Sequence, residues 1–124
     1  MNVVDSSGWL EYYSNGANAA FFTPPIEDVA QLLVPAVCVF EVYKGVLGQS
    51  GEGNALRAVV QMRLARVIDL NTPLAMLAAR VSLELKLPLA DSVILATARA
   101  HGAVLWTQDR DLKGVDGVKY VAKK

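Results

Sequence analysis

The chain has 124 residues, the length of one domain, and its hydrophobic fraction of 53% supports a sizeable buried core. Twelve basic side chains balance twelve acidic ones, so the formal charge is zero. This balance excludes a strongly basic protein that coats nucleic acid, whereas an enzyme that acts on nucleic acid needs only a local electric field.

Strand-like apolar runs alternate with longer helical stretches along the whole chain. In the first part of the chain we expect a strand over Asn2–Val4, a polar turn over Asp5–Gly8, a helix over Trp9–Ser14 and a helical turn over Asn18–Phe22. A second strand over Gln31–Val34 is followed by helices over Ala36–Leu47 and Asn54–Arg66, and a third strand over Arg66–Leu70 by helices over Thr72–Leu85 and Ala90–His101. The chain then continues with a strand over Ala103–Trp106, a polar turn over Gln108–Asp111 and a last edge strand over Gly117–Val121. This alternation predicts an α/β fold with a mainly parallel sheet, in a single domain spanning residues 1–124.

Prolines and glycines set several of these boundaries. The pair Pro24–Pro25 is expected to stop the helical turn, and three glycines within Gly48–Gly53 are expected to separate two helices. Thr72 is expected to cap the following helix, with Pro73 at its first position. The helix over residues 54–66 is predicted from apolar residues at helical spacing, namely Leu56, Val59, Val60 and Leu64.

Several classes of protein are disfavoured by what the sequence lacks. No apolar run approaches the roughly 20 residues needed to cross a membrane, and the first residues carry no basic stretch, so we expect neither a membrane span nor a secretory signal. The single cysteine, Cys38, cannot form an internal disulfide, which is compatible with a cytoplasmic location. Cys38 and His101 lie far apart in sequence, which disfavours a zinc site and a cysteine–histidine nucleophile. No glycine-rich phosphate loop is present, which disfavours a nucleotide-hydrolysing switch.

Two acidic residues directly follow predicted strands. Asp5 follows the first strand and Asp109 lies just beyond the fourth. In open parallel α/β sheets, ligands bind outside the carboxyl ends of the strands, so both carboxylates are expected at the functional edge. The alternative for each residue is a plain role as turn former or helix N-cap.

Two further acids lie within apolar helical segments. Glu41 shares a helical face with the small residue Gly45, which leaves room for a ligand, while the alternative is a solvated Glu beside Lys44. Asp91 lies at the start of an apolar helix, where capping is the alternative role because a carboxylate is favoured at the positive end of a helix dipole.

If these four carboxylates converge, they cannot all be ionised and unpaired, because like charges at close range raise one another's pKa. A hard divalent cation such as Mg²⁺ or Mn²⁺ removes that cost and prefers oxygen ligands. Such sites serve phosphoryl chemistry, in which the ion activates a water and stabilises charge on the leaving oxygen. The sequence leaves open whether one ion or two would bind.

Four segments, one around each acid, follow one another in the chain: Val3–Trp9, Val34–Val42, Leu87–Ala98, and Leu105–Leu112 with its Thr-x-Asp-x-Asp turn. Together they resemble the PIN domain family, specifically the small VapC-type toxin ribonucleases of toxin–antitoxin pairs. The resemblance covers essentially the whole chain. It implies a three-layer α/β/α sandwich around a parallel sheet, metal-dependent endonucleolytic cleavage of RNA, a protein antitoxin as partner and a homodimer.

The resemblance also implies roles for individual residues. It makes Asp5, Glu41, Asp91 and Asp109 the catalytic acids that bind Mg²⁺ or Mn²⁺, and it makes Asp111 a variable additional acid. Thr107 and Ser7 match polar positions that support the metal ligands. The alternative is a purely structural role, Thr107 as a strand former and Ser7 as a helix cap.

Other conspicuous side chains have structural explanations. His101 precedes a glycine at a helix end, where the helix dipole favours it, so we expect a C-terminal capping role and not a general base. Cys38 and Trp9 are expected in the core, and Tyr12 is expected to be at least half-buried. The alternative for Trp9 and Tyr12 is a surface that binds a partner protein.

Basic residues near the acids have two interpretations. Arg110 and Lys113 flank the acidic turn. These two residues and Lys44 could contact a phosphate backbone, or they could simply balance the nearby negative charge. The basic residues near the end of the chain are expected to be solvated, namely Lys119, Lys123 and Lys124.

Three other functions compete with a nuclease. A receiver-like signalling module needs paired acids after a strand and a lysine at a later strand end, and the sequence offers Asp69 near the third strand without those partners. A phosphatase with an aspartyl nucleophile needs a second acid where Ser7 stands. A non-catalytic PIN-like module that acts through protein partners is disfavoured because all four acids are present.

Overall fold

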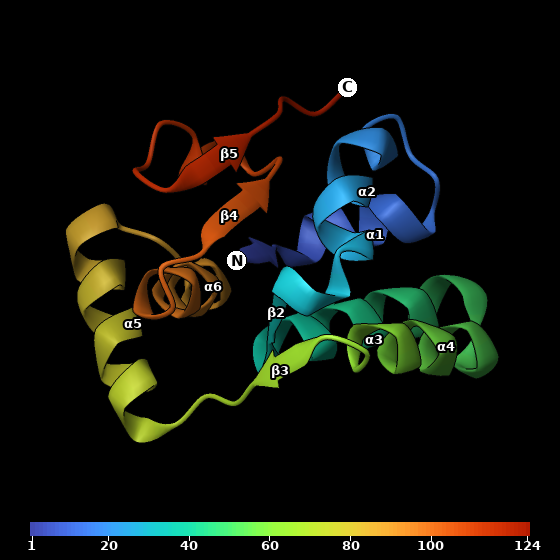
Figure 1. Ribbon diagram of the computed structural model, residues 1–124, viewed down its shortest axis with the longest axis horizontal. Coiled ribbons are helices and arrows are strands. Elements are labelled where there is room, and N and C mark those ends of the chain that lie inside the picture. Colours follow the sequence, from blue (N-terminus) through green and yellow to red (C-terminus); the bar gives the residue numbers. More distant parts are fainter.

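The computed structural model describes residues 1–124 and contains five strands and six α-helices, with two short 3-10 helices (Figure 1). The strands are β1 (Asn2–Val4), β2 (Leu32–Pro35), β3 (Arg66–Ile68), β4 (Val104–Thr107) and β5 (Val118–Tyr120). The helices are α1 (Ser6–Tyr13), α2 (Ala19–Glu27), α3 (Ala36–Ser50), α4 (Glu52–Met62), α5 (Thr72–Leu85) and α6 (Leu89–Ala100), and the 3-10 helices are η1 (Val29–Gln31) and η2 (Arg110–Leu112). No helix is both long enough and apolar enough to cross a membrane.

The five strands form one parallel sheet in the order β3-β2-β1-β4-β5. In the central strand, the fully buried Val3 pairs with Leu33 of β2 and Leu105 of β4. Because all strands are parallel, their carboxyl ends meet at one edge of the sheet, and the segments that follow β1, β2 and β4 meet there too. Receiver-like modules have the strand order 2-1-3-4-5, so the topology contradicts the receiver-like alternative.

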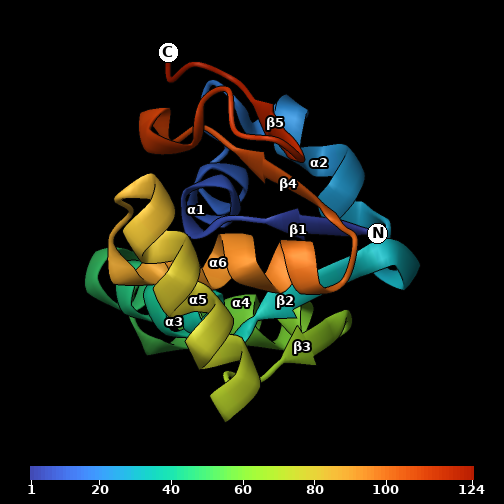
Figure 2. The same cartoon turned by 90° about the vertical axis from the view of Figure 1, so that its left-hand side faces the viewer.

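Helices cover both faces of the sheet, which confirms the predicted three-layer α/β/α arrangement. Figure 2 looks onto α5 and α6, which pack against each other on one face, with α6 in contact with β1, β2 and β4. Helices α1 and α2 lie on the opposite side of the sheet, and α3 and α4 form an adjacent pair next to β2 and β3 (Figure 1). The interior position of α6 explains its apolar sequence, because every residue from Ser92 to Ala98 is buried.

The first helix begins at Ser6, three residues earlier than predicted. Asp5 caps it, since the Oδ1 atom of Asp5 accepts the backbone N–H of Gly8 at 2.9 Å. Gly8 fits inside the helix for a packing reason: a Cβ there would come within 2.7 Å of Phe22 and Val4. The polar run predicted as a turn is therefore the first turn of a helix that packs closely on the sheet.

The pair Pro24–Pro25 does not stop α2, contrary to the prediction, and the helix continues to Glu27. The hydroxyl of Thr23 donates to the Ala19 carbonyl at 2.9 Å, which satisfies one acceptor inside this proline-containing helix. Ile26 lies buried in the core beyond the prolines. Packing of this last turn outweighs the two missing backbone donors.

The predicted break over Gly48–Gly53 shrinks to a single residue. Helix α3 continues to Ser50 and α4 begins at Glu52, so only Gly51 lies between them. The φ angle of Gly51 is +84°, a backbone conformation that glycine adopts at little cost. The other two glycines lie inside the helices, where their exposed positions tolerate them.

Helix α5 is capped by Asn71 and not by Thr72. The Oδ1 atom of Asn71 accepts the N–H of Leu74 at 3.0 Å, and Thr72 is the first helical residue. Pro73 follows in the first turn, where its missing N–H has no partner to lose. The helix was predicted correctly and its cap was placed one residue late, because Asn and Thr are both good capping residues.

Helix α4 leaves part of its predicted apolar row, Leu56 and Val60, exposed to solvent. Ala55, Ala58 and Met62 are buried, whereas Leu56 is 48% exposed and Val60 is 65% exposed. The predicted helical spacing is present, but the large apolar side chains face solvent. This exposed row of α4 is available for contact with another molecule.

Candidate metal centre

Four of the predicted acids lie on segments that begin or end at the carboxyl edge of the sheet. Asp5 follows β1 directly, and Asp109 lies two residues beyond β4. Glu41 lies in α3, the helix that leaves β2 at this edge, and Asp91 is the third residue of α6. Because α6 runs antiparallel to the strands that it covers, its N-terminus reaches the same edge (Figure 2). The topology therefore brings residues from four separate parts of the sequence toward one place.

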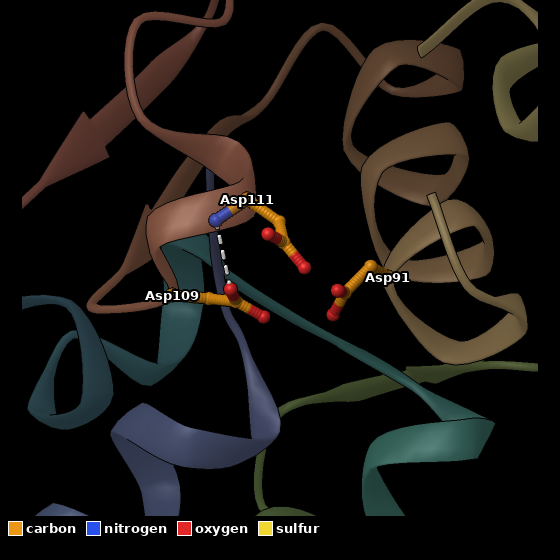
Figure 3. Close-up of side chains that lie close together, drawn as sticks. All are labelled: Asp91, Asp109 and Asp111. Carbon is orange, nitrogen blue, oxygen red and sulfur yellow. Dashed lines mark hydrogen bonds between the residues drawn. The ribbon is translucent and has the colours of Figure 1, made fainter. Parts of the chain in front are cut away.

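Asp91, Asp109 and Asp111 form the tightest acidic group. One carboxylate oxygen from each residue lies within 4.8 Å of those of the other two. Figure 3 shows the side chain of Asp91 pointing from α6 toward the two carboxylates on the turn after β4. The N–H of Asp111 donates to Oδ1 of Asp109 at 2.9 Å, which folds this turn and brings its two acids to the same side. Asp111, expected only as an additional acid, thus belongs to the closest group.

Asp5 lies outside this closest group and is held by hydrogen bonds. Its side chain is 3% exposed, and Oδ1 accepts from the Ser7 hydroxyl and from the Gly8 N–H, each at 2.9 Å. Its Oδ2 atom accepts from the hydroxyl of Thr107. Burial raises the pKa of Asp5 above its ordinary value, and the hydrogen bonds oppose this shift by stabilising the carboxylate. The negative charge of Asp109 adds a smaller upward contribution to the pKa of Asp5.

Thr107 connects Asp5 to the turn that carries the closest acidic group. Its hydroxyl donates to Asp5 and accepts the backbone N–H of Asp109 at 2.9 Å. Strand β4 ends one residue later than predicted, so Thr107 is its last residue and is fully buried. The two acids are thereby linked through the side chain of Thr107, whose predicted role in supporting metal ligands stays a prediction.

Glu41 is oriented by Ser6, a residue that the sequence analysis did not single out. The hydroxyl of Ser6 donates to Oε1 of Glu41 at 2.6 Å, and Glu41 is partly buried. Lys44 lies over the ring of Phe40, 5.8 Å from its centroid, so it does not serve as the solvent-side partner considered for Glu41. The space beside Gly45 is not free for a ligand either, because a Cβ there would lie 3.0 Å from the side chain of Leu10.

The charge of Asp91 is costly in this arrangement. Burial raises the pKa of Asp91 to about 7, together with the negative charge of Asp109, hydrogen bonding to Asp109 and the more distant charges of Asp5 and Asp111. A carboxylate that resists ionisation near neutral pH is a sign of uncompensated negative charge. A bound cation would remove that cost.

Cys38 reports that Glu41 shares this environment. Burial raises the pKa of the Cys38 thiol, and the negative charges of Asp5, Glu41 and Asp91 raise it further. The thiol is fully buried and donates weakly to the Val4 carbonyl at 3.8 Å, as expected for a core cysteine. The charges of all three acids thus act on this buried thiol, although only Asp91 belongs to the closest acidic group.

The residues present fit a hard divalent cation. The closest acidic group offers only carboxylate oxygens, which Mg²⁺ and Mn²⁺ prefer, and it offers no sulfur or imidazole ligand. The raised pKa of Asp91 shows what leaving these charges unpaired costs. The donor set and its charge thus agree with the cation expected from the sequence.

The remaining conspicuous residues have structural roles. The Nδ1 atom of His101 lies 2.9 Å from the Thr97 carbonyl at the end of α6, in agreement with the expected helix-end role. Trp9 is fully buried in the core, and Tyr12 is partly buried with its hydroxyl donating to Glu27 at 3.1 Å. Neither His101 nor Trp9 belongs to the acidic site.

Two buried polar residues beside the site were missed. The Nδ2 atom of Asn18 donates to Oε1 of Gln108 at 2.9 Å, and both side chains are at most 6% exposed. This bond joins the segment before α2 to the turn after β4, and the two residues are 90 positions apart. No local pattern in the sequence indicates such a long-range pair.

Comparisons with known proteins agree with the fold. A family model described as PIN domain matches residues 3–118. A toxin–antitoxin complex from Klebsiella pneumoniae has 23% sequence identity and a TM-score of 0.81, with 96% of each chain covered.

Two further solved structures are similar over most of their length. VapC20 from Mycobacterium tuberculosis, described as a toxin that cleaves the sarcin-ricin loop, has 15% identity and a TM-score of 0.77, covering 94% of this chain and 95% of that one. PAE2754 from Pyrobaculum aerophilum has 26% identity and a TM-score of 0.69, covering 98% and 90%. The comparison with curated proteins finds no match. Since the family model spans nearly the whole chain and the sheet and helices have the expected order, the chain belongs to the PIN domain family.

Proposed function

We propose that this protein is a Mg²⁺- or Mn²⁺-dependent endoribonuclease and the toxin of a toxin–antitoxin pair. The observation that carries the proposal is the convergence of Asp91, Asp109 and Asp111, with Asp5 joined to them through Thr107. Membership of the PIN domain family supports a nuclease, and the VapC20 structure is that of a toxin described as cleaving an RNA loop.

The residues of this chain would divide the work. Asp91, Asp109 and Asp111 would hold the cation, and Asp5 would fix the turn of Asp109 through Thr107. When bound, the cation would supply an activated water and compensate the charge that develops on the phosphate. Glu41, already oriented by Ser6, would accept a hydrogen bond from the attacking water and align it with the phosphodiester.

Protein partners belong to the same proposal. The Klebsiella pneumoniae structure is described as a toxin–antitoxin complex, which supports an antitoxin as partner here. Exposed apolar side chains support further protein contacts, since Leu64 after α4 is 69% exposed and Leu83 on α5 is 83% exposed. An antitoxin partner stays a prediction that co-purification would test. A homodimer stays a prediction that mass measurement in solution would test, and a cytoplasmic location is one for cell fractionation.

A non-catalytic PIN-like module is the alternative. A protein that acts only through partners gains nothing from bringing Asp91, Asp109 and Asp111 together, where the pKa of Asp91 is raised to about 7. Acidic clusters with a raised pKa are typical of functional sites, because the repulsion between their charges destabilises the fold unless the cluster serves a function. The geometry therefore favours the enzyme.

The decisive experiment is cleavage of total cellular RNA by the purified protein. Reactions with Mg²⁺, with Mn²⁺ and with chelator are compared, and new RNA ends are mapped by sequencing. We expect discrete ends that require a divalent cation. Asp5→Asn and Asp109→Asn are expected to abolish them, because each variant loses a negative charge and one acceptor oxygen while keeping nearly the same shape.

The matched control is Asp28→Asn, the same chemical change at an exposed acid without a side-chain capping bond. We expect this control to cleave like the wild type. Cleavage retained in a pure, folded Asp109→Asn preparation would contradict the proposed mechanism. Ends that form equally in chelator would contradict the metal requirement.

A further inference from the structure

A polar hollow of about 510 Å³ adjoins the acidic site on the side of β5. Its walls come from the turn after β4 and from the residues after β5, which lie side by side in Figures 1 and 2. Asp109 lines this hollow and also belongs to the closest acidic group. A ligand lying in the hollow would therefore reach the acidic site without crossing the protein surface elsewhere.

Hydrogen bonds hold the outer wall of the hollow in place. The N–H of Val121 donates to the Thr107 carbonyl at 3.0 Å, and the Nδ2 atom of Asn18 donates to the Ala122 carbonyl at 3.0 Å. These bonds fix the backbone of the two residues before Lys123, which lines the hollow. Lys123 is exposed, as expected for a solvated basic segment, and it also lines the hollow.

The charge of the hollow is opposite to that of the acidic site. Arg110, Lys113 and Lys123 line it with a single carboxylate, that of Asp109. Arg110 and Lys113 come from the short η2 turn and the residue after it, so the fold concentrates three cations in a chain whose formal charge is zero. Local concentration of cations attracts a polyanion even where the net charge does not.

An aromatic ring completes the hollow. Tyr120, the last residue of β5, lines it, and the Nζ atom of Lys113 lies 5.8 Å from the centroid of the Tyr120 ring. Cations that track a phosphate backbone, next to a ring on which a base can stack, are the combination by which proteins bind single-stranded nucleic acid. An acidic peptide would use the cations but would have no need of the partly exposed ring of Tyr120.

We propose that this hollow is a binding subsite for single-stranded RNA, occupied by a nucleotide next to the phosphodiester that the acidic site cleaves. Arg110, Lys113 and Lys123 bind phosphate oxygens of the strand, and the Tyr120 ring stacks on one base. Asp109 marks the boundary between this subsite and the acidic site. The inference rests on the proposed ribonuclease function, because it names the path by which the strand reaches that site.

The first test is binding of a short fluorescein-labelled single-stranded RNA in chelator, where cleavage does not compete. The double variant Lys113→Gln/Lys123→Gln removes two phosphate contacts, so the slope of log affinity against log salt is expected to become shallower by about 1.4. The matched control is Arg63→Gln/Arg80→Gln, the same loss of two exposed cations, one just after α4 and one on α5. The control is expected to keep the wild-type slope.

The second test addresses the ring. Tyr120→Leu is expected to weaken binding of the same RNA roughly tenfold, because base–aromatic stacking is lost. Tyr120→Phe keeps the ring and is expected to bind like the wild type. Thermal unfolding of each variant verifies that the fold is retained, and a purely structural role of Tyr120 would change the melting temperature without changing the affinity of the folded protein.

Identical salt slopes for the two double variants would overturn the subsite. So would pocket substitutions that release a co-purified protein while leaving RNA binding unchanged, because that result assigns the hollow to a protein. If the wild type cleaves RNA and the variants in the hollow bind RNA normally, the subsite proposal is wrong and the ribonuclease proposal stands. RNA binding through the hollow without metal-dependent cleavage contradicts the ribonuclease and leaves the subsite intact.

Discussion

The hydroxyl of Thr107 donates to the carboxylate of Asp5 and so joins the first strand of the chain to the fourth. The same hydroxyl oxygen accepts the N–H of Asp109. One buried side chain thus sets the distance between an acid at the end of β1 and the turn that carries two further acids. Because both hydrogen bonds of its hydroxyl are made with acidic residues, we treat Thr107 as a positioning residue of the site.

Thr107→Val is expected to weaken the binding of Mn²⁺ roughly 10–100-fold, as the loss of a residue that orients metal ligands commonly does. Valine has nearly the same shape but neither donates to Asp5 nor accepts from Asp109, so both groups lose a partner in a buried place. Isothermal calorimetry with Mn²⁺ measures the affinity, and RNA cleavage at saturating Mn²⁺ measures what remains.

Thr107→Ser is the matched control, because it retains the hydroxyl and loses one methyl group. We expect it to keep the wild-type affinity for Mn²⁺ even if its melting temperature falls. Equal affinities for Thr107→Val and wild type would show that Thr107 acts only as a strand residue.

The sequence predicts the location of the site better than its internal contacts. Strand ends and helix starts are local features, so Asp5, Asp91 and Asp109 could be assigned to one edge once the strands were recognised. The role of Ser6 could not be predicted, because its hydrogen bond to Glu41 depends on how α1 packs on α3.

The errors in the fold have the same physical origin. Pro24–Pro25 was predicted to end a helix from its local chemistry, and burial of Ile26 carries the helix further. Asp5–Gly8 was predicted as a turn, and the close packing of Gly8 on the sheet makes it a helix start. In both segments tertiary packing overrides a correct reading of local propensity.

The free energy of unfolding of the metal-free protein is expected to fall as the pH rises between 3.8 and about 7, through the contribution of Asp91. Its pKa is raised from 3.8 to about 7 in the folded state, so over this interval the unfolded chain binds fewer protons. The contribution of Asp91 is thus present below its unfolded pKa and is lost as the pH passes its folded pKa.

Asp91→Asn removes this dependence and is expected to raise the melting temperature in chelator at about pH 8 by a few degrees, or ~1 kcal/mol after discounting for solvent screening at this half-buried group. Melting curves at about pH 5 and about pH 8 measure the difference between variant and wild type. A variant that is less stable than wild type at the higher pH would contradict the raised pKa.

Asp111 is expected to bind the cation directly, although it is exposed. Its carboxylate lies in the closest acidic group, and the N–H bond to Asp109 holds it there. Asp111→Asn should therefore lower the affinity for Mn²⁺ by at least about tenfold. Binding of Mn²⁺ also stabilises the folded state by ~2.7 kcal/mol at 100 times its dissociation constant, so the melting temperature gives a second measurement.

Asp116→Asn, at an exposed acid in the loop before β5, is the matched control for Asp111→Asn. It should retain the full stabilisation by Mn²⁺. If both variants respond to Mn²⁺ like the wild type, the ion is held without Asp111, and the additional acid serves only to shape the turn.

Ser6→Ala is expected to slow RNA cleavage without changing the affinity for Mn²⁺. Ser6 orients Glu41, which lies outside the closest acidic group, so releasing Glu41 should affect the alignment of the water more than the binding of the ion.

Ser7→Ala is the matched comparison, because Ser7 donates to Asp5, which has two further donors in Gly8 and Thr107. The cleavage rate should therefore fall further in Ser6→Ala than in Ser7→Ala, and the rate at saturating Mn²⁺ is the quantity to compare. A slower reaction in Ser7→Ala than in Ser6→Ala would place the water-aligning role on Asp5 and remove it from Glu41.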